Sequence, residues 1–505
     1  MPIRPFTRDQ VWLLPPALED MIPSDHVVRF VATFVDSLEL SALGLRQAAA
    51  VRGGLEYDVR VLLAAWLYGF MTGVRSTRRL EQLAYENLPM IWLEGGQRPD
   101  HSTLARFLQA NREAMKKLFK QTVHTAVQVG LVGFAFQAID GTRVANVSRD
   151  KALTRKELLA LEGRVERAIE EMERGVADAE QGASAEDTTR KMPKQLTDPV
   201  ALREQIGVAL AELDRREKER KSPAKGAVDP ETGERWGPPV HLADPEAVLM
   251  KGRRGYVLGY NAQVAVDAKD QVIVAAEVVA SATDNEQQIP MLQETEETAG
   301  RMAEVTVMDA GYHSAKNVEA TQGMPTDLYV ADPEMRRSKG TPEKKPFHKD
   351  AFLYDAERNS YTCPQGKTLT FDHQTQDKKH GGRLIRAYRC HACLSCVHFG
   401  VCTRDHHGRT IRTRPQDHLL RLHRKKMGGD TAKAYMKQRS AVVEPVFAIL
   451  KERLGLTRFL RRGLANVRAE WHLLCAAYNL RKLWKHRTEM VGLLIGQPQA
   501  LETGN

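Results

Sequence analysis

Three acidic residues, far apart in the sequence, stand in settings where a carboxylate could act on a phosphate. Asp140 ends an alternating apolar run, Asp309 ends the run EVTVMD before Ala-Gly, and Glu444 lies beside an apolar stripe with basic residues around it. Carboxylate oxygens are the ligands that Mg²⁺ prefers, and bound Mg²⁺ can promote displacement at a phosphodiester. Taken singly, Asp140 is also compatible with an Asp-Gly turn and Glu444 with a solvated helix face.

Residues 435–458 predict the helix that carries Glu444. Apolar residues recur there at spacings of three and four, and Lys451 lies two turns beyond Glu444 on the same side. Pro445 is awkward, because proline lacks a backbone N–H and is tolerated only in the first turn of a straight helix. The helix therefore either begins at Pro445 or is kinked there.

The segments around Asp140 and Asp309 predict a mixed sheet. A strand at 134–140 ends in a Gly turn, and the runs GYNAQVAVDA and QVIVAAEVVAS form a hairpin. A helix, the strand ending at Asp309, a short helix and the strand TDLYVADP follow. This order is that of an RNase H-like fold, which has acids on the first strand, after the fourth strand and on a final helix. Asp140, Asp309 and Glu444 fall on those three places.

Residues 1–130 predict an all-helical domain with a basic surface. Arginines lie near the helix ends, and a helix-turn-helix arrangement of this kind suits contacts with DNA phosphates and base edges. The connection over residues 88–100 is longer than a standard turn, and a helical packing domain without a ligand explains the same pattern. The candidate DNA-binding residues here are Arg75, Arg78, Arg79 and Arg106.

Two insertions interrupt the predicted sheet domain. Residues 150–245 contain two amphipathic helices that read as a helical hairpin, and residues 340–425 contain five of the six cysteines. Thiolates two residues apart can grip one tetrahedral zinc ion, and the Cys-Pro-x-Gly turn resembles part of a zinc ribbon. Four ligands are needed and the choice stays open, as does a loop of free thiols. The candidates are Cys363, Cys390, Cys393, Cys396 and Cys402.

The composition favours a polyanionic partner. The chain has 505 residues and a net charge of +10, with 27% charged and 42% hydrophobic residues, which is ordinary for a soluble multidomain protein. Neither a secretory signal nor a membrane-spanning run is apparent. The clustered cysteines indicate metal binding in a reducing compartment. We therefore expect a cytoplasmic, nucleoid-associated protein.

The motifs AIDGTRVANVSRDK, GYNAQVAVD, VMDAGYHS and VVEPVFAILKERLGLTRFLRRGLANVRAEWHLL resemble those of DDE transposases of bacterial insertion sequences. The region from GGLEYDVRVLL to HSTLARF is similar to an InsH-type N-terminal domain. The resemblance implies an α/β protein with a helical DNA-binding domain at 1–130 and an RNase H-like catalytic domain at 131–485. The insertions at 150–245 and 340–425 interrupt that catalytic domain, and residues 486–505 form a tail.

The resemblance also implies the roles of individual residues. Asp140, Asp309 and Glu444 form the catalytic triad and hold two Mg²⁺ or Mn²⁺ ions, while a structural Zn²⁺ sits among the cysteines. The signature around the last acid includes Arg439 and Lys451, which hold the scissile or flanking phosphate. Tyr435, one residue too far from Arg439, departs from that signature. Further contacts with DNA fall to Arg458, Arg461 and Arg462.

The sequence thus predicts a DNA transposase that cuts at the terminal inverted repeats of its own element and joins the ends to target DNA. We expect a homodimer or higher synaptic complex. Two alternatives remain open: an RNase H-like nuclease without strand transfer, and an inactive or domesticated zinc-containing DNA-binding protein.

Overall fold

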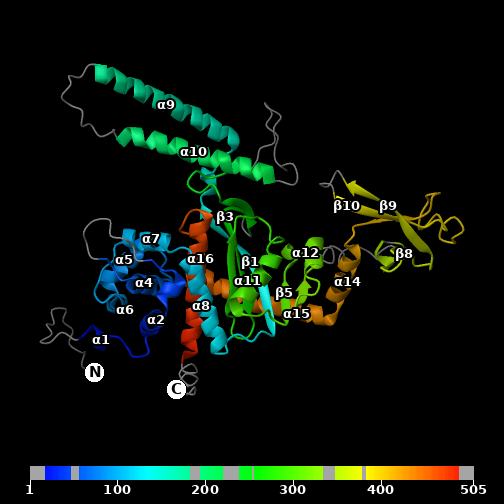
Figure 1. The fold of residues 1–505 in the computed structure, drawn as a ribbon, viewed down its shortest axis with the longest axis horizontal. Helices are drawn as coiled ribbons and strands as arrows, with labels where there is room; N and C mark the ends of the chain where they lie inside the picture. The colour runs from blue at the N-terminus through cyan, green and yellow to red at the C-terminus, as the bar shows by residue number, and fades with distance from the viewer. Residues whose placement is uncertain are drawn as a thin grey trace, which may run out of the picture. The chain divides into compact units, whose positions relative to one another are not determined.

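The structure is a computed structural model that describes residues 17–46, 56–181, 194–219, 238–252, 255–333, 347, 349–377 and 383–487 (Figure 1). Its contacts divide the chain into two units. The first contains residues 1–131, 447–461 and 465–505, and the second contains residues 132–446 and 462–464. The contacts therefore group residues 447–461 and 465–485 with the N-terminal helices, whereas the sequence assigned them to the catalytic domain. From residue 488 on, the predicted tail lies outside the described residues.

The first unit is built from helices packed around two that are buried on most sides. Helix α4 (Val59–Met71) and helix α16 (Leu464–Lys485) carry apolar side chains around most of their circumference, as core helices do. In the described part of the chain, none of the helices is both long and apolar enough to cross a membrane. The other helices are α1 (Leu18–Met21), α2 (Val27–Asp36), α3 (Leu40–Leu43), α5 (Thr77–Glu86), α6 (Leu88–Leu93), α7 (His101–Ala110) and α8 (Ala114–Gln128).

A buried ion pair fixes the loop that precedes α16. The side chains of Arg75 and Glu470 are 3% and 2% exposed and pair with each other. Arg75 also donates to the carbonyl oxygens of Gly455 at 2.6 Å and Arg458 at 2.9 Å. Glu470 accepts from the backbone N–H groups of Leu460 and Arg461, each at 3.0 Å. Because its guanidinium is buried and both terminal nitrogens donate within the unit, Arg75 has a structural position in place of the predicted contact with DNA.

The second unit contains a mixed sheet with RNase H-like topology, as predicted. Strand β1 (Phe136–Val147) lies at its centre, antiparallel to β3 (Gly255–Asp267) and parallel to β5 (Val305–Met308). Strand β6 (Asp327–Val330) extends the parallel side. On the other side, β3 pairs with both β2 (Val248–Gly252) and β4 (Ile273–Val279), and β3 and β4 form the predicted hairpin. This order places the C-terminal end of β5 beside the middle of β1.

Strand β1 does not end at Asp140, so the predicted Gly turn is wrong. Gly141 continues the strand and pairs with Gln263, and the ladder with β3 runs on to Val147. The physical reason is the length of β3, which supplies a pairing partner well beyond the alternating run that was visible in the sequence. Asp140 is therefore held by a strand on both sides of it rather than by a turn.

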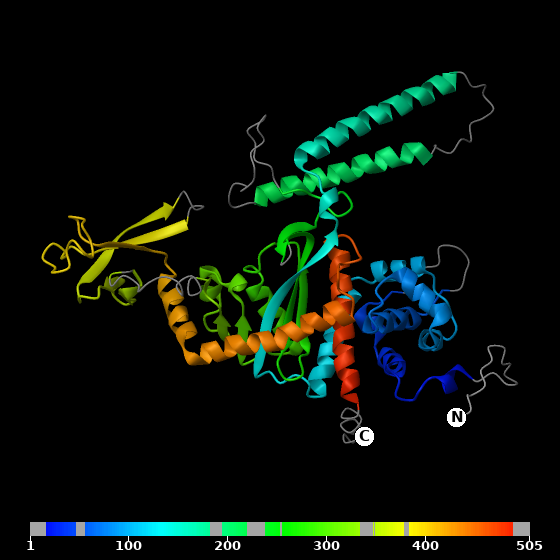
Figure 2. The ribbon, with the colours of Figure 1, turned by 180° about the vertical axis from the view of Figure 1, so that it is seen from behind.

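Helix α15 (Asp430–Ala448) crosses the sheet region (Figure 2) and runs through Pro445 instead of beginning there. Proline at 445 cannot donate to the carbonyl oxygen of Ala441, one helical turn earlier. The side-chain amide of Gln271 donates to that oxygen at 3.2 Å instead. A short π-helical segment (Ile449–Arg453) follows α15 and carries Lys451. A side chain from the sheet thus supplies the hydrogen bond that proline removes.

The predicted insertions contain the expected helices and a second sheet. Helices α9 (Arg155–Gln181) and α10 (Lys194–Glu219) pack against each other through Val165, Ile169 and Ile206. The cysteine-rich segment forms an antiparallel sheet in the order β11-β10-β9-β8-β7. Its strands are β7 (Leu353–Asp355), β8 (Ser360–Thr362), β9 (Thr368–Asp377), β10 (Arg383–Arg389) and β11 (Thr410–Thr413). The remaining helices are α11 (Gln288–Ala299), α12 (Ala315–Ala320) and α14 (Asp417–Gly428).

Removing one charge of the buried pair should destabilise the first unit strongly. We expect Glu470→Gln to lower the free energy of unfolding by about 3–5 kcal/mol, because Arg75 then carries an uncompensated buried charge. Urea unfolding measures the change. The matched control is Glu86→Gln, since Glu86 forms an exposed pair with Arg79 at 2.9 Å. This substitution should change the free energy of unfolding by less than about 1 kcal/mol. Equal effects of the two substitutions would contradict the assignment.

Candidate active site

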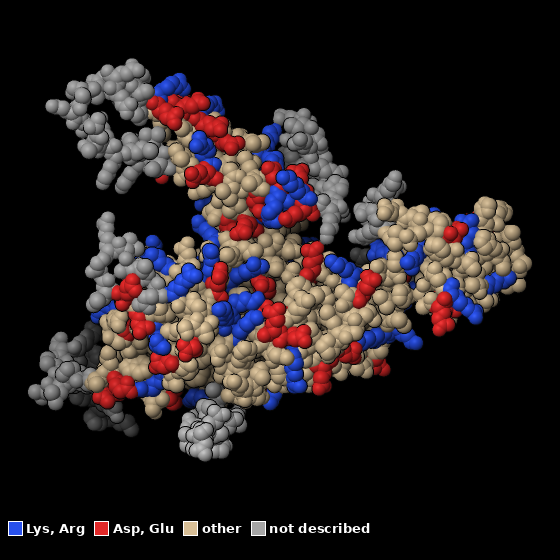
Figure 3. Space-filling view, viewed as in Figure 1, with Lys and Arg blue, Asp and Glu red and all other residues tan. Residues whose placement is uncertain are grey.

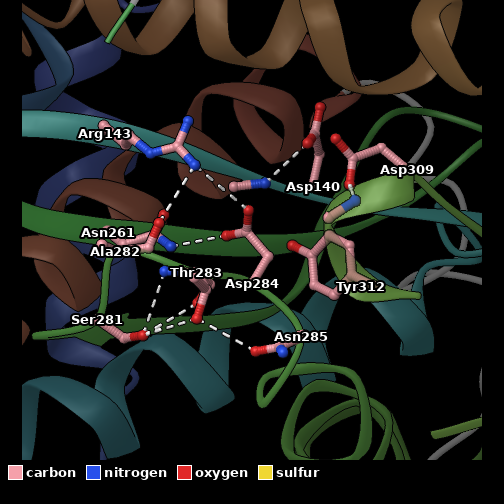
Figure 4. Close-up of polar contacts among 12 residues, drawn as sticks. Asp140, Arg143, Asn261, Ser281, Ala282, Thr283, Asp284, Asn285, Asp309 and Tyr312 are labelled. Carbon is pink, nitrogen blue, oxygen red and sulfur yellow. Dashed lines mark hydrogen bonds and ion pairs between the residues drawn. The ribbon is translucent and has the colours of Figure 1, made fainter. Parts of the chain in front are cut away.

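Asp140 and Asp309 lie side by side because their strands are parallel and in register. Ile139 of β1 pairs with Met308 of β5. The residue that follows each of them is an aspartate, Asp140 or Asp309. Asp309 caps a short 3₁₀ turn (Ala310–Tyr312), where its carboxylate accepts from the N–H of Gly311 at 2.7 Å. The close-up in Figure 4 shows both carboxylates at the same end of the sheet. The structure therefore brings together two of the three predicted acids.

Helix α15 delivers a cation to this pair. Arg439 donates to Oδ2 of Asp140 at 2.9 Å, and both side chains are mostly buried. Burial raises the pKa of Asp140 above its usual value, Arg439 opposes that rise, and the negative charge of Asp309 adds to it. Tyr435, one turn earlier on α15, packs against Phe136 and Tyr329 and seats the helix on the sheet. The site is thus two crowded carboxylates with one counter-charge.

Glu444 is the predicted acid that the structure does not bring to the pair. It lies five residues after Arg439 on α15, and its side chain is exposed. Neighbouring Val443 is fully buried, so the face of the helix that meets the sheet at this level is apolar. Among the described residues, Glu444 makes no hydrogen bond or ion pair with Asp140 or Asp309.

A third carboxylate, which the sequence analysis missed, lies close to both aspartate loops. Oδ1 of Asp284 accepts from the side-chain amides of Asn261 at 2.7 Å and Gln263 at 2.8 Å. Arg143 of β1 lies 3.7 Å from its Oδ2, as Figure 4 shows. Tyr312, fully buried, donates to Gln263 and completes the cluster. The signal in the sequence was an acid shortly after a strand, the same setting that identified Asp140 and Asp309.

The cluster explains why glycine follows both aspartates. A Cβ added at Gly141 would lie 2.3 Å from Nε2 of Gln263 and 3.0 Å from Oδ1 of Asp284. A Cβ at Gly311 would lie 2.9 Å from Oδ2 of Asp284 and 2.9 Å from Oδ1 of Asp309. Neither glycine has a positive φ, so close approach rather than backbone conformation requires it. Each Asp-Gly or Asp-Ala-Gly motif therefore makes room for Asp284.

Asn317 of α12 ties the two loops of the site together. Its side-chain amide donates to the carbonyl oxygen of Asn285 at 2.6 Å and to that of Tyr312 at 2.7 Å. One loop carries Asp284 and the other follows Asp309. Because the amide is 6% exposed, water competes little for these bonds, and the spacing of the two loops is fixed by the fold.

The pair of aspartates fits the ligand chemistry of Mg²⁺, which proteins commonly bind through one or two carboxylates together with substrate phosphates. The wider ligand set is not assembled: over the described ranges, no group of three or more His, Cys, Asp or Glu side chains is arranged to hold a metal ion. Asp140 and Asp309 are therefore the residues that would hold a divalent cation, and Glu444 is not positioned to do so.

The cysteines of the second sheet face a common cavity. Cys363, Cys390, Cys393, Cys396 and Cys402 line it together with His398. The N–H of Lys367 donates to Sγ of Cys363 at 3.3 Å, and the N–H of Arg409 donates to Sγ of Cys393 at 3.3 Å. Burial raises the pKa of Cys390 to about 11. The donor chemistry fits zinc, although the thiols do not converge on one point.

The predicted basic residues occupy different environments. Arg78, Arg79 and Arg106 are exposed on α5 and α7 of the first unit. Arg458 and Arg462 are exposed, whereas the guanidinium of Arg461 lies 5.2 Å from the ring centre of Trp66. Lys451 is exposed and its Nζ lies 5.7 Å from the ring centre of Phe447. Arg79 also pairs with Glu86 at 2.9 Å, so exposure alone does not separate these side chains into one class.

An acidic side chain caps the start of α7. Asp100 caps the helix and accepts from the N–H groups of Ser102 at 2.8 Å and Thr103 at 2.9 Å. The hydroxyls of the same two residues also donate to its carboxylate. These hydrogen bonds lower the pKa of Asp100, so the carboxylate stays charged. The N–H and hydroxyl donors at the start of α7 are thus already occupied by an acid.

The hairpin of α9 and α10 presents acidic side chains to solvent. Glu166, Glu170 and Glu173 are exposed at spacings of four and three along α9, and Figure 3 shows red patches along this hairpin. Residues spaced in this way share one face of a helix. That face of α9 is repulsive to a DNA backbone.

The close approach at Gly141 can be tested by adding a methyl group. We expect Gly141→Ala to lower the free energy of unfolding by about 1–3 kcal/mol, because the Cβ overpacks against Gln263 and Asp284. Thermal unfolding measures the effect. Gly163 on α9 has no atom within 4 Å of an added Cβ. Gly163→Ala should therefore be neutral or stabilising by up to about 1 kcal/mol. A neutral Gly141→Ala variant would mean that the cluster is not tightly packed.

Two family models match separate parts of the chain. The description "Transposase domain (DUF772)" belongs to the model that matches residues 16–110, and "Transposase DDE domain" belongs to the one that matches residues 362–484. The second match includes β9, β10, β11, the five clustered cysteines and Glu444 but not β1 or β5. No curated protein matches the sequence significantly. Over those residues the chain is thus similar to transposase domains, and the RNase H-like sheet lies between the two matched segments.

Proposed function

We propose that this protein is a DNA transposase that binds the ends of its insertion sequence and catalyses metal-dependent strand cleavage and strand transfer. The observation that carries the proposal is the meeting of Asp140 and Asp309 where β5 ends beside β1, with Arg439 against Asp140. Two crowded carboxylates suit a divalent cation, and an adjacent arginine suits a phosphate. The two transposase matches support the same reaction class.

The roles of the residues follow from their positions. Asp140 and Asp309 would hold Mg²⁺ or Mn²⁺, which when bound supplies activation of water or a 3′-hydroxyl and stabilises the leaving oxygen. Arg439 would hold a phosphate of the cut strand by charge-assisted hydrogen bonds. Asp284, supported by Asn261 and Gln263, keeps the backbones of both aspartate loops in place. Glu444 and Lys451 are proposed from the resemblance, Glu444 as the third acid and Lys451 as a further contact with a phosphate.

The partners follow from the same reading. We propose that DNA is the partner, both as the terminal inverted repeats of the element and as the target. Joining two ends requires two active sites, so we expect a homodimer or a higher synaptic complex. A nuclease without strand transfer would need the same aspartates and differs only in its products.

One observation favours a second candidate, a DNA-binding protein without activity. Glu444 is exposed and separate from the aspartate pair, so the triad is incomplete in this conformation. A binding protein would retain the basic surface and would not need the third acid. The cleavage test below separates the two candidates.

Zinc belongs to the proposal as a structural ion of the cysteine-rich sheet. The support is the shared cavity of five thiols and the two N–H···S bonds, which are typical of the surroundings of metal thiolates. Binding would draw four of the thiols together, because structural zinc sites form with the ion rather than before it.

The first experiment measures cleavage of a plasmid that carries the DNA flanking the gene, with Mg²⁺ or Mn²⁺. We expect the wild type to cut at defined ends. Asp309→Asn should cut at least about a hundredfold more slowly because an amide binds the cation poorly, which removes several kcal/mol of transition-state stabilisation. Both should shift the flanking DNA equally in a gel.

The matched control for this test is Asp150→Asn, the same chemical change at a carboxylate that is 84% exposed. It should cut like the wild type. Equal cutting by wild type and Asp309→Asn would show that the site is elsewhere. If neither cuts but both bind DNA, the binding-protein reading replaces the transposase. A Glu444→Gln variant that cuts normally would remove Glu444 from the site.

Metal analysis of the purified chain tests the zinc proposal. We expect bound zinc in the wild type and its loss in Cys390→Ala, because Cys390 is one of the buried thiols of the cavity. Cys475→Ala is the control, since Cys475 is buried in α16 within the other unit. A wild-type protein that contains no zinc and still unfolds at its normal temperature would contradict the zinc proposal.

A further inference from the structure

The first unit contains a surface cleft that the candidate active site does not use. It has a volume of about 580 Å³ and lies where α7 ends and α8 begins. Its lining includes the side chains of Arg46, Arg106 and Arg112, with Glu113 as the acidic member. All three arginines are exposed. The cleft is therefore open to solvent and strongly basic.

Among the residues that the structure describes, no acidic side chain pairs with the arginines of this cleft. In the described part of the first unit, none of the three guanidinium groups forms an ion pair. Arg106 donates only to the hydroxyl of Thr103, at 3.1 Å. A fourth cation stands behind the cleft, because Nζ of Lys117 would lie 3.7 Å from a Cβ at Gly44. Like charges converge here at an electrostatic cost, which an anionic ligand removes.

The floor of the cleft is rigid. Asn111 is 2% exposed and joins the loop after α3 to the corner between α7 and α8. Its Oδ1 accepts from the N–H of Arg46 at 2.6 Å, and its amide donates to the carbonyl oxygens of Arg46 at 3.1 Å and Phe107 at 3.0 Å. The backbone that presents Arg46 is therefore fixed relative to the helix that carries Arg106.

Two features point to a nucleic acid backbone as the anion. Arginine presents a planar fork that matches phosphate oxygens, and successive phosphates of a duplex can engage several such forks. The start of α7, by contrast, is occupied by Asp100 and cannot take a phosphate. Near the C-terminal end of α7, the arginines of the cleft thus carry positive charge that no described acidic side chain pairs with.

We propose that the cleft formed by Arg46, Arg106 and Arg112 binds backbone phosphates of DNA and positions the N-terminal unit on the duplex. This inference rests on the proposed function, because it takes DNA as the ligand. It adds Arg46 and Arg112 to Arg106, which the sequence indicated. Phosphate contacts fix register and orientation and leave sequence reading to other side chains.

The test measures the affinity of the full chain for a fluorescent duplex from the DNA flanking the gene, over a range of NaCl concentrations. Each lost phosphate contact should reduce the slope of log K against log[NaCl] by about 0.9. We expect Arg112→Ala and Arg46→Ala each to reduce the slope by this amount, and the double variant to bind at least roughly tenfold more weakly. The control is Arg60→Ala, which removes the same charge from an exposed position on α4 and should leave the slope unchanged.

The outcomes are distinguishable. If the wild type does not bind the duplex at all, the proposed function fails and the cleft proposal falls with it. If the wild type binds but the cleft variants behave like Arg60→Ala, only the cleft proposal is overturned. If inorganic phosphate raises the unfolding temperature of the wild type but not of Arg112→Ala, while duplex binding is unchanged, the cleft holds a small anion and not DNA. Unchanged unfolding temperatures of the variants without ligand exclude misfolding as the cause.

Discussion

The parallel pairing of β1 with β5 is the constraint on which the candidate site depends. The register that joins Ile139 to Met308 places Asp140 and Asp309 next to each other, although 168 residues separate them in the sequence. The burial of Asp140 and the negative charge of Asp309 beside it raise the pKa of Asp140. Arg439 supplies a cation in this structure. The site therefore favours positive charge, and a divalent cation can bind there together with a phosphate.

The polar cluster around Asp284 shows how the fold accommodates a third acid beside the paired strands. Because the Asp284 carboxylate lies close to two backbones, the residues there must lack a Cβ, and these residues are Gly141 and Gly311. Asn261 and Gln263 of β3 then satisfy the acid. The motifs that look like simple turns in the sequence are therefore packing requirements, because glycine allows the third acid to approach.

Tertiary packing also sorts the basic residues into structural and available ones. Arg75 pairs with Glu470 and donates to carbonyl oxygens of the loop before α16. Its buried charge therefore has a structural role. The arginines at the end of α7 lack such partners among the described residues and converge around one cleft. Net charge indicates a polyanionic partner but does not tell which cations meet it.

The sequence by itself determined the local elements and the settings of the acids. Alternation predicted the β3–β4 hairpin and the strands that end at Asp140 and Asp309, and helical spacing predicted α9, α10 and α15, because these patterns are local and repeat with the period of the element. Only the tertiary structure decided that β1 continues through Gly141, that Asp284 joins the site, that Arg75 is buried and that Glu444 stands apart. Each of these depends on a partner more than a hundred residues away or on the direction of a helix face, and a local period carries no information about either.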